Sequence, residues 1–252
     1  MFESMKSKFT LNIVFASIST ALVCVATMLF QVYVPATRGF FNIGESMVFL
    51  SALLFGPFVG AFAGGIGSML ADLLLGYYYY APATLLIKAS EGFIVGFLSS
   101  RHPKFSPAKW KILTALLGIL IGGFLAIIGA LYYSGEVELT IGQITTMLKI
   151  PTIFWIGLGL IAAISIATIG LFTEPEAGWI VLSVIAGGFV MVLGYFIYQM
   201  FLIGPLFGIE AFAIAEVPIN IGQMTVGSII AIPAVKIVRK IFSLQGKANH
   251  FK

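Results

Sequence analysis

The sequence predicts an all-α fold, a polytopic transmembrane helix bundle of about eight spans in a single domain over residues 1–252. Three observations support this prediction. Of the 252 residues 60% are hydrophobic and only 10% are charged, whereas a soluble domain carries roughly a quarter charged residues. The mean hydropathy is +1.06. Most of the apolar runs approach the roughly 20 residues that a membrane-spanning helix needs.

The expected spans follow the apolar runs in chain order. Lys6 and Lys8 precede the first run as in a signal peptide, but that run is too long for one and is interpreted as a retained span. The second run is short and meets the third at Gly56-Pro57, so a re-entrant hairpin is an alternative there. The eight runs cover residues 11–34, 45–55, 61–76, 83–98, 112–132, 150–172, 179–203 and 212–235.

Charges between the runs predict the orientation, because cytoplasmic loops of membrane proteins are rich in Lys and Arg. With the N-terminus inside, Arg38 falls outside and eleven of the fourteen basic residues fall inside. These eleven are Lys6, Lys8, Arg101, Lys104, Lys109, Lys111, Lys236, Arg239, Lys240, Lys247 and Lys252. Both termini are therefore expected in the cytoplasm. Since loop charges explain the basic balance, no nucleic-acid partner is expected.

Several polar residues lie inside the apolar runs, where a charged side chain costs about 2.5–3.5 kcal/mol. Lys88 and Glu91 are neighbours on one helical face at i and i+3. Under the expected topology most of these residues fall in the outer half of the membrane, which predicts one polar pocket open to the outside. The candidate substrate-binding residues are Asn42, Glu45, Asp72, Lys88, Glu91, Tyr195, Tyr198, Gln199, Glu216, Asn220 and Gln223.

Structural roles are alternatives for some of these residues. Lys88 and Glu91 could form a neutralised packing pair without a ligand. The tyrosines at 77–80, which follow Asp72, could anchor the chain at the lipid headgroups. Small residues recur every fourth position at Gly60, Gly64 and Ser68 before Asp72. Such a row lets a neighbouring helix approach closely.

Enzymatic activity and metal binding are not expected. His102 and His250 lie in the predicted cytoplasmic segments, and Cys24 is the only cysteine, so neither a Ser-His arrangement nor a zinc site can be assembled in the membrane. The only Gly-Lys pair is followed by Ala248 and is not a Walker A motif. No cofactor is expected, and an ATP-driven step would need another subunit.

Three separated motifs resemble, in the expected order, the substrate-binding S components of energy-coupling factor (ECF) transporters. They are NIGESMVFLSALLFGPFVG at 42–60, GGIGSMLAD at 64–72 with YAPATLLIKASEG at 80–92, and AEVPINIGQ at 215–223. The resemblance covers about residues 10–100 and 179–240 and favours the riboflavin and hydroxymethylpyrimidine subgroup. It implies a six-span core, to which residues 112–172 add an inserted helical pair.

The resemblance implies a non-enzymatic subunit in the plasma membrane of a prokaryote that captures a vitamin or vitamin precursor from outside. Its implied partners are a membrane coupling (T) subunit and two ABC-type ATPases. The first span of such proteins often docks on the T subunit through an Ala-x-x-x-Ala motif. The corresponding small residues here are Ala16, Ser17, Thr20 and Ala21, which depart from the strict motif.

Two other functions remain open from the sequence. One is a stand-alone proton-coupled secondary transporter, in which Asp72, Glu91 or Glu216 would carry protons; the other is a membrane scaffold. Secondary carriers usually bind their substrate between internal repeats, and no convincing repeat relates the two halves of this chain. The excess of carboxylates over Lys88 in the polar cluster favours a neutral or cationic ligand.

Overall fold

The computed structural model describes residues 2–34, 39–101, 105–132, 134–141, 144–172, 174–207 and 212–249. Arg38, predicted on the outer side, and His102, Lys104, His250 and Lys252, predicted on the cytoplasmic side, are not among the described residues. Within the described residues, seven helices are long and apolar enough to cross a membrane. The chain is therefore a multi-pass membrane protein, as expected.

The helices are α1 (Phe2–Leu29), α2 (Gly44–Phe55), α3 (Pro57–Leu75), α4 (Ala81–Ser99), α5 (Pro107–Tyr132), α6 (Thr152–Phe172), α7 (Pro175–Tyr198), the short α8 (Gly204–Phe207) and α9 (Phe212–Asn249). A π-helical segment, Gln199–Ile203, joins α7 to α8. The count of about eight spans needs a correction at α2. This helix has 12 residues and is roughly 18 Å long at 1.5 Å per residue, which is short of the membrane core of about 30 Å.

The helical prediction is confirmed for the bundle, and two short β-hairpins that the sequence did not indicate accompany the helices. Strand β1 (Gln31–Val34) pairs antiparallel with β2 (Gly39–Asn42), and β3 (Gly135–Ile141) pairs with β4 (Ile144–Ile150). The first span, expected to extend to residue 34, ends at Leu29. The β-branched and aromatic residues of β1 fit a strand better than a helix end, and β1 finds a partner in β2.

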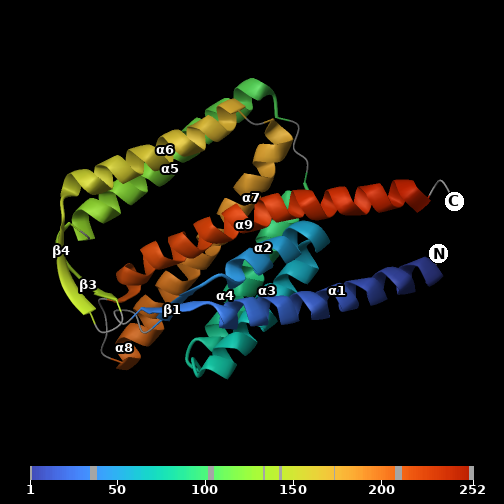
Figure 1. Cartoon of the computed structure of the whole chain (residues 1–252), viewed down its shortest axis with the longest axis horizontal. Helices are drawn as coiled ribbons and strands as arrows, with labels where there is room; N and C mark the ends of the chain where they lie inside the picture. Colours follow the sequence, from blue (N-terminus) through green and yellow to red (C-terminus); the bar gives the residue numbers. More distant parts are fainter. Residues whose placement is uncertain are drawn as a thin grey trace. The chain divides into compact units, whose positions relative to one another are not determined.

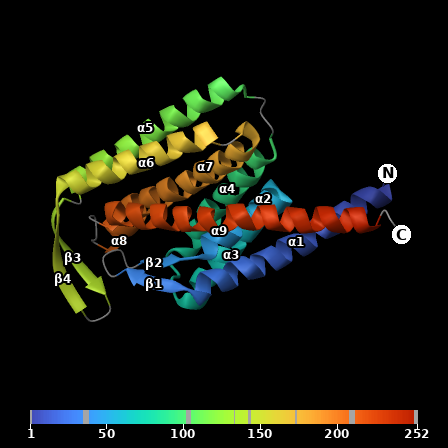
Figure 2. The same cartoon turned by 45° about the horizontal axis from the view of Figure 1, so that its top comes forward.

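The chain forms two compact units. Unit 1 comprises Met1–Arg101 and Ile180–Lys252, and unit 2 comprises His102–Trp179. In unit 1, α2 packs against α1, α3, α4 and α9 and is the most enclosed helix. Figures 1 and 2 show the free ends of α1 and α9 at one end of unit 1 and the β1–β2 hairpin at the other. The start of α9 therefore lies near that hairpin.

Small residues hold α3 and α4 together, as the four-residue spacing predicts. A Cβ atom built on Gly64 would lie 2.7 Å from the carbonyl oxygen of Lys88, and one built on Gly60 would lie 2.7 Å from the carbonyl oxygen of Gly92. The helix backbones are thus in direct contact, and side chains on α4 are fixed relative to α3. The predicted junction at Gly56 is confirmed, because this glycine has a φ of 87°, which favours glycine, and separates α2 from α3.

Unit 2 is a helical hairpin. Helices α5 and α6 pack along their length, and the β3–β4 hairpin connects them (Figure 2). Gly122 and Gly159 face each other so closely that a Cβ on either would meet the other's backbone. The inserted pair expected at residues 112–172 falls inside this unit. Its role stays a prediction, as does the assignment of the whole chain to a single domain.

Candidate functional site

A pocket in unit 1 brings together polar residues from six helices and the first hairpin. The unfilled space, which includes the open mouth, is about 530 Å³. The pocket is lined by Thr27 of α1, Phe40 and Asn42 of β2, Glu45 of α2, Ser68 and Asp72 of α3, Thr84 and Lys88 of α4, Tyr195 of α7, and Glu216, Asn220 and Gln223 of α9, with Tyr77 and Tyr80 from the α3–α4 connection.

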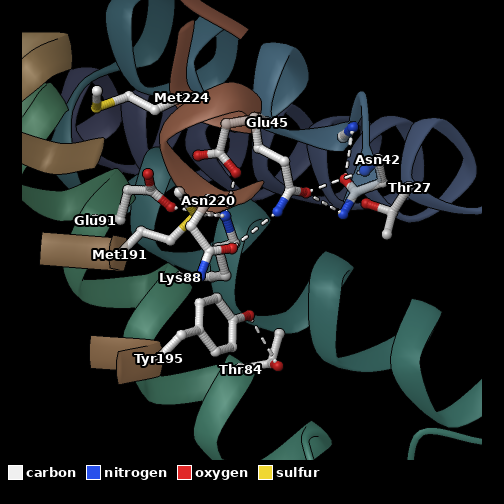
Figure 3. A network of polar contacts seen from close by, with 12 residues as sticks. Thr27, Asn42, Glu45, Thr84, Lys88, Glu91, Met191, Tyr195, Asn220 and Met224 are labelled. Atoms are coloured by element: carbon white, nitrogen blue, oxygen red, sulfur yellow. Dashed lines mark hydrogen bonds and ion pairs between the residues drawn. The ribbon is translucent and has the colours of Figure 1, made fainter. Parts of the chain in front are cut away.

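One wall of the pocket is a buried ion triad. The Lys88 ammonium group on α4 forms ion pairs with Glu45 on α2 and with Glu91, one turn further along α4, at 3.0 Å from its Oε2. It also lies 2.8 Å from the sulfur atom of Met191 on α7. Glu45 and Glu91 are at most 1% exposed. The triad therefore joins α2, α4 and α7 at the level of the pocket (Figure 3).

An amide network forms a second wall. The Gln223 side-chain oxygen accepts hydrogen bonds from the backbone N–H of Asn42, at 3.1 Å, and from its side-chain amide, at 2.6 Å. Gln223 Nε2 donates in turn to Asn220 Oδ1 at 3.0 Å (Figure 3). Asn42 Oδ1 also accepts from the N–H of Gly44 at the start of α2. The network thus ties the first hairpin to α9 and to the helix that carries Glu45.

Aromatic residues form the remaining wall. The Tyr195 hydroxyl group donates to Thr84 Oγ1 at 3.0 Å, and the ammonium group of Lys88 lies 5.9 Å from the centre of the Tyr195 ring. The rings of Phe40 and Tyr77 are 4.7 Å apart. Aromatic faces of this kind can stack on a flat ligand.

Tyr80 is held at the pocket by the π-helical segment after α7. Gln199, the first residue of that segment, donates from Nε2 to the Tyr80 hydroxyl oxygen at 3.1 Å. Burial and the nearby Glu216 carboxylate raise the pKa of Tyr80 to about 12. Its hydroxyl group therefore stays protonated at physiological pH and can donate a hydrogen bond into the pocket.

Of the eleven candidate residues, eight line the pocket: Asn42, Glu45, Asp72, Lys88, Tyr195, Glu216, Asn220 and Gln223. Three do not. Glu91 lies behind Lys88 and has no exposed surface. Gln199 and Tyr198 bond instead to Tyr80 and to the backbone carbonyl oxygen of Tyr79, respectively. These three residues support the pocket from behind, and they are not included among the proposed ligand contacts.

Sequence reasoning missed six lining residues: Thr27, Phe40, Ser68, Tyr77, Tyr80 and Thr84. A signal for Thr84 was available, because it lies four residues before Lys88 and seven before Glu91, on the same helical face. For Tyr77 and Tyr80 the sequence also allows a role as anchors at the lipid headgroups. For Thr27 and Phe40 the sequence offers no comparable signal, since their place depends on how α1 and the first hairpin pack.

Together, a bundle of apolar helices and a buried pocket rich in polar groups define a small-molecule-binding membrane protein. The residues of the described ranges include no group of three or more His, Cys, Asp or Glu side chains suited to a metal ion. The pocket chemistry is instead that of hydrogen bonding, charge and aromatic stacking.

Comparison with known proteins identifies the family within this class of membrane proteins. Residues 8–174 match the family "ECF-type riboflavin transporter, S component". This is about two thirds of the chain, and the match extends through the α5–α6 hairpin. The chain belongs to this family: it is a substrate-binding S component of a transporter and not an enzyme.

Two relatives are consistent with the family assignment. A Pyrococcus woesei protein named "Uncharacterized protein in gap 3'region" is 44% identical over 107 residues, which are 42% of this chain and 67% of that protein. The "Thiamine precursor transporter HmpT" of Lactococcus lactis subsp. cremoris (strain MG1363) is 26% identical over 133 residues, 52% of this chain and 75% of that protein.

Proposed function

We propose that the pocket of unit 1 is the capture site for a vitamin or vitamin precursor of the riboflavin or hydroxymethylpyrimidine type. The observation that carries this proposal is the convergence of eight predicted polar residues on one pocket within a transporter S component. The names of the family and of the thiamine precursor transporter supply the candidate ligands. Both candidates are heterocycles with hydrogen-bonding groups, which the amide and aromatic walls suit.

We further propose that the pocket opens to the outside and that both termini are cytoplasmic. Glu45 lies in the first turn of α2, whereas Arg239 donates from Nη2 to the carbonyl oxygen of Leu53 near the other end of that helix, at 2.7 Å. Arg239 belongs to the basic end of α9, with Lys236 and Lys240. The basic end of unit 1 is thus opposite the pocket, and basic segments favour the cytoplasmic side.

The partners that complete the importer would be a membrane coupling (T) subunit and two ABC-type ATPases. The proposed contact on this chain is the small-residue face of α1. Ser17 and Ala21 are exposed there, whereas Ala16 and Thr20 are half-buried and the Thr20 carbonyl oxygen lies close to Gly67. The hydroxyl groups of Ser17 and Thr20 bond to carbonyl oxygens one turn back. The face is therefore smooth and needs no polar partner.

The capture function is tested with the purified full chain and with whole cells. We expect the chain alone to bind hydroxymethylpyrimidine or riboflavin in calorimetry, and uptake in cells to require a T subunit and an ATPase pair. If the chain binds neither compound, the proposed ligand class is overturned. Uptake by the chain alone in liposomes, driven by a proton gradient, would favour the secondary-transporter alternative.

The docking face is tested by adding bulk to it. We expect Ser17→Leu with Ala21→Leu to reduce uptake in cells at least tenfold and to leave ligand binding by the purified chain unchanged. Ser165→Leu on α6, also an exposed small residue on a span, is the matched control and should have no effect. Normal uptake by the double variant would exclude this face as the docking site.

A further inference from the structure

Buried polar atoms that lack a hydrogen-bond partner among the described residues include two at the pocket. They are Oε1 of Glu45 and Nδ2 of Asn220, and both residues line the pocket while being at most 2% exposed. The Asn220 amide is oriented by Gln223, which donates to Asn220 Oδ1 and leaves the Nδ2 donor available. A buried donor or acceptor without a partner is costly. A ligand that offers one donor and one acceptor would satisfy both.

The ammonium group of Lys88 at the pocket is already surrounded by side chains of the protein. Among the described residues that line the pocket, Lys88 is the only Lys or Arg, and its ammonium group has three N–H donors. Glu45, Glu91 and Met191 all contact that group. An incoming anion would therefore find no free ammonium donor there.

Apart from Lys88 and the tyrosines, the ionisable side chains among the described residues that line the pocket are carboxyl groups. Glu45, Asp72 and Glu216 face the same space, each at most 6% exposed. Charges in such a water-poor site interact more strongly than in bulk water. A negatively charged ligand would add to this excess, whereas an amino group or a cation would reduce it.

From these contacts we infer that the pocket selects aromatic heterocycles that are neutral or cationic and carry hydrogen-bond donors, and that it excludes their phosphate esters. This inference rests on the proposed function, because it describes the ligand of the same site. The ring of the ligand would stack on the aromatic wall. Its donor would bond to Glu45 Oε1, and its acceptor would receive a hydrogen bond from Asn220 Nδ2.

The test compares each compound with its own phosphate ester on the purified full chain. Hydroxymethylpyrimidine and riboflavin are titrated by calorimetry, and so are hydroxymethylpyrimidine phosphate and riboflavin 5′-phosphate. We expect at least one parent compound to bind and its ester to bind at least 100-fold more weakly. Equal affinity within threefold, or preference for the ester, would overturn the charge selection and leave the capture function intact. If none of the four compounds binds, both the charge selection and the proposed capture function are overturned.

Variants identify the groups responsible for the selection. Asp72→Asn with Glu216→Gln should reduce the preference for the parent compound at least tenfold, because it removes negative charge without removing the side chains. Glu174→Gln, at an exposed position of unit 2, is the matched control and should preserve the preference. An unchanged preference in the double variant would contradict the role of these carboxylates, and the comparison of esters on the native chain tests the inference without any variant.

Discussion

Replacement of Lys88 by Met tests whether the buried triad holds the pocket together. Methionine has a similar length and would fit beside Met191, so the change removes a charge with little change in volume. It leaves Glu45 and Glu91, at most 1% exposed, without their shared cation. Removing one partner of a buried ion pair costs about 3–5 kcal/mol, because the other charge stays buried and uncompensated.

The expected loss is measurable by thermal unfolding of the purified protein. For a chain of this size 1 kcal/mol corresponds to about 2–4 °C in Tm, so we expect Lys88→Met to lower the Tm by roughly 6–20 °C at neutral pH. Lys109→Met, an exposed lysine near the start of α5, is the matched control and should shift the Tm by less than about 2 °C.

A triple variant separates charge from packing. With Glu45→Gln and Glu91→Gln added to Lys88→Met, no buried charge remains in the triad, and most of the lost stability should return, since neutral replacements of buried ion groups are often tolerated. If Lys88→Met unfolds within 2 °C of the native protein, or if the triple variant is no more stable than Lys88→Met, the triad does not carry the stability that its burial implies.

Three further predictions concern other parts of unit 1 and its pocket. Gly64→Ala places a Cβ 2.7 Å from a carbonyl oxygen of α4 and should destabilise the protein by about 1–3 kcal/mol in thermal unfolding. Asn42→Ala removes the side-chain hydrogen bond to Gln223 and the one that Asn42 Oδ1 accepts from Gly44, and should weaken ligand binding about tenfold in calorimetry, equivalent to about 1.4 kcal/mol. Tyr80, whose pKa is about 12, should ionise later than an ordinary tyrosine, whose pKa is about 10, in an ultraviolet absorbance titration. Since its folded-state pKa is raised, its contribution to stability should be present below pH 10 and lost as the pH rises toward 12.

Each of these predictions has a result that would contradict it. Gly123→Ala, at a helical glycine of α5 with open space around the built Cβ, should be neutral or stabilising; a loss equal to that of Gly64→Ala would contradict the packing argument. Unchanged ligand affinity in Asn42→Ala would show that the amide network does not contribute to ligand binding. For Tyr80, the titration of Tyr80→Phe should differ from that of the native protein only above about pH 11, and a difference near pH 10 would contradict the raised pKa.

Much of the pocket could be predicted because polar residues are rare in this chain. Lys88 and Glu91 are three residues apart on one helix, so their pairing follows from helix geometry alone. The row of Gly60, Gly64 and Ser68 likewise predicts a close helix contact, which α3 and α4 form. Such local spacings survive folding because helix periodicity does not depend on the rest of the chain.

The errors fall where a segment's environment decides its structure. Residues 31–34 continue an apolar run, and their conversion into β1 depends on the pairing with β2. Helix α2 is apolar like its neighbours, and only its 12-residue length distinguishes it from a span. The β3–β4 hairpin has no strong turn signal in the sequence, and both strands, up to Ile150, fall in the loop expected between the spans 112–132 and 150–172.

The sequence by itself determined the membrane location, most helices and the identity of most pocket residues, because hydropathy and helix periodicity are local properties. Only the tertiary structure decided which of those residues face one another. It paired Glu45 with Lys88, 43 positions apart, placed Glu91 behind the pocket wall, and brought Asn42 to Gln223 across 181 positions. Contacts between distant segments depend on how the helices pack, and no local pattern in the sequence specifies that packing.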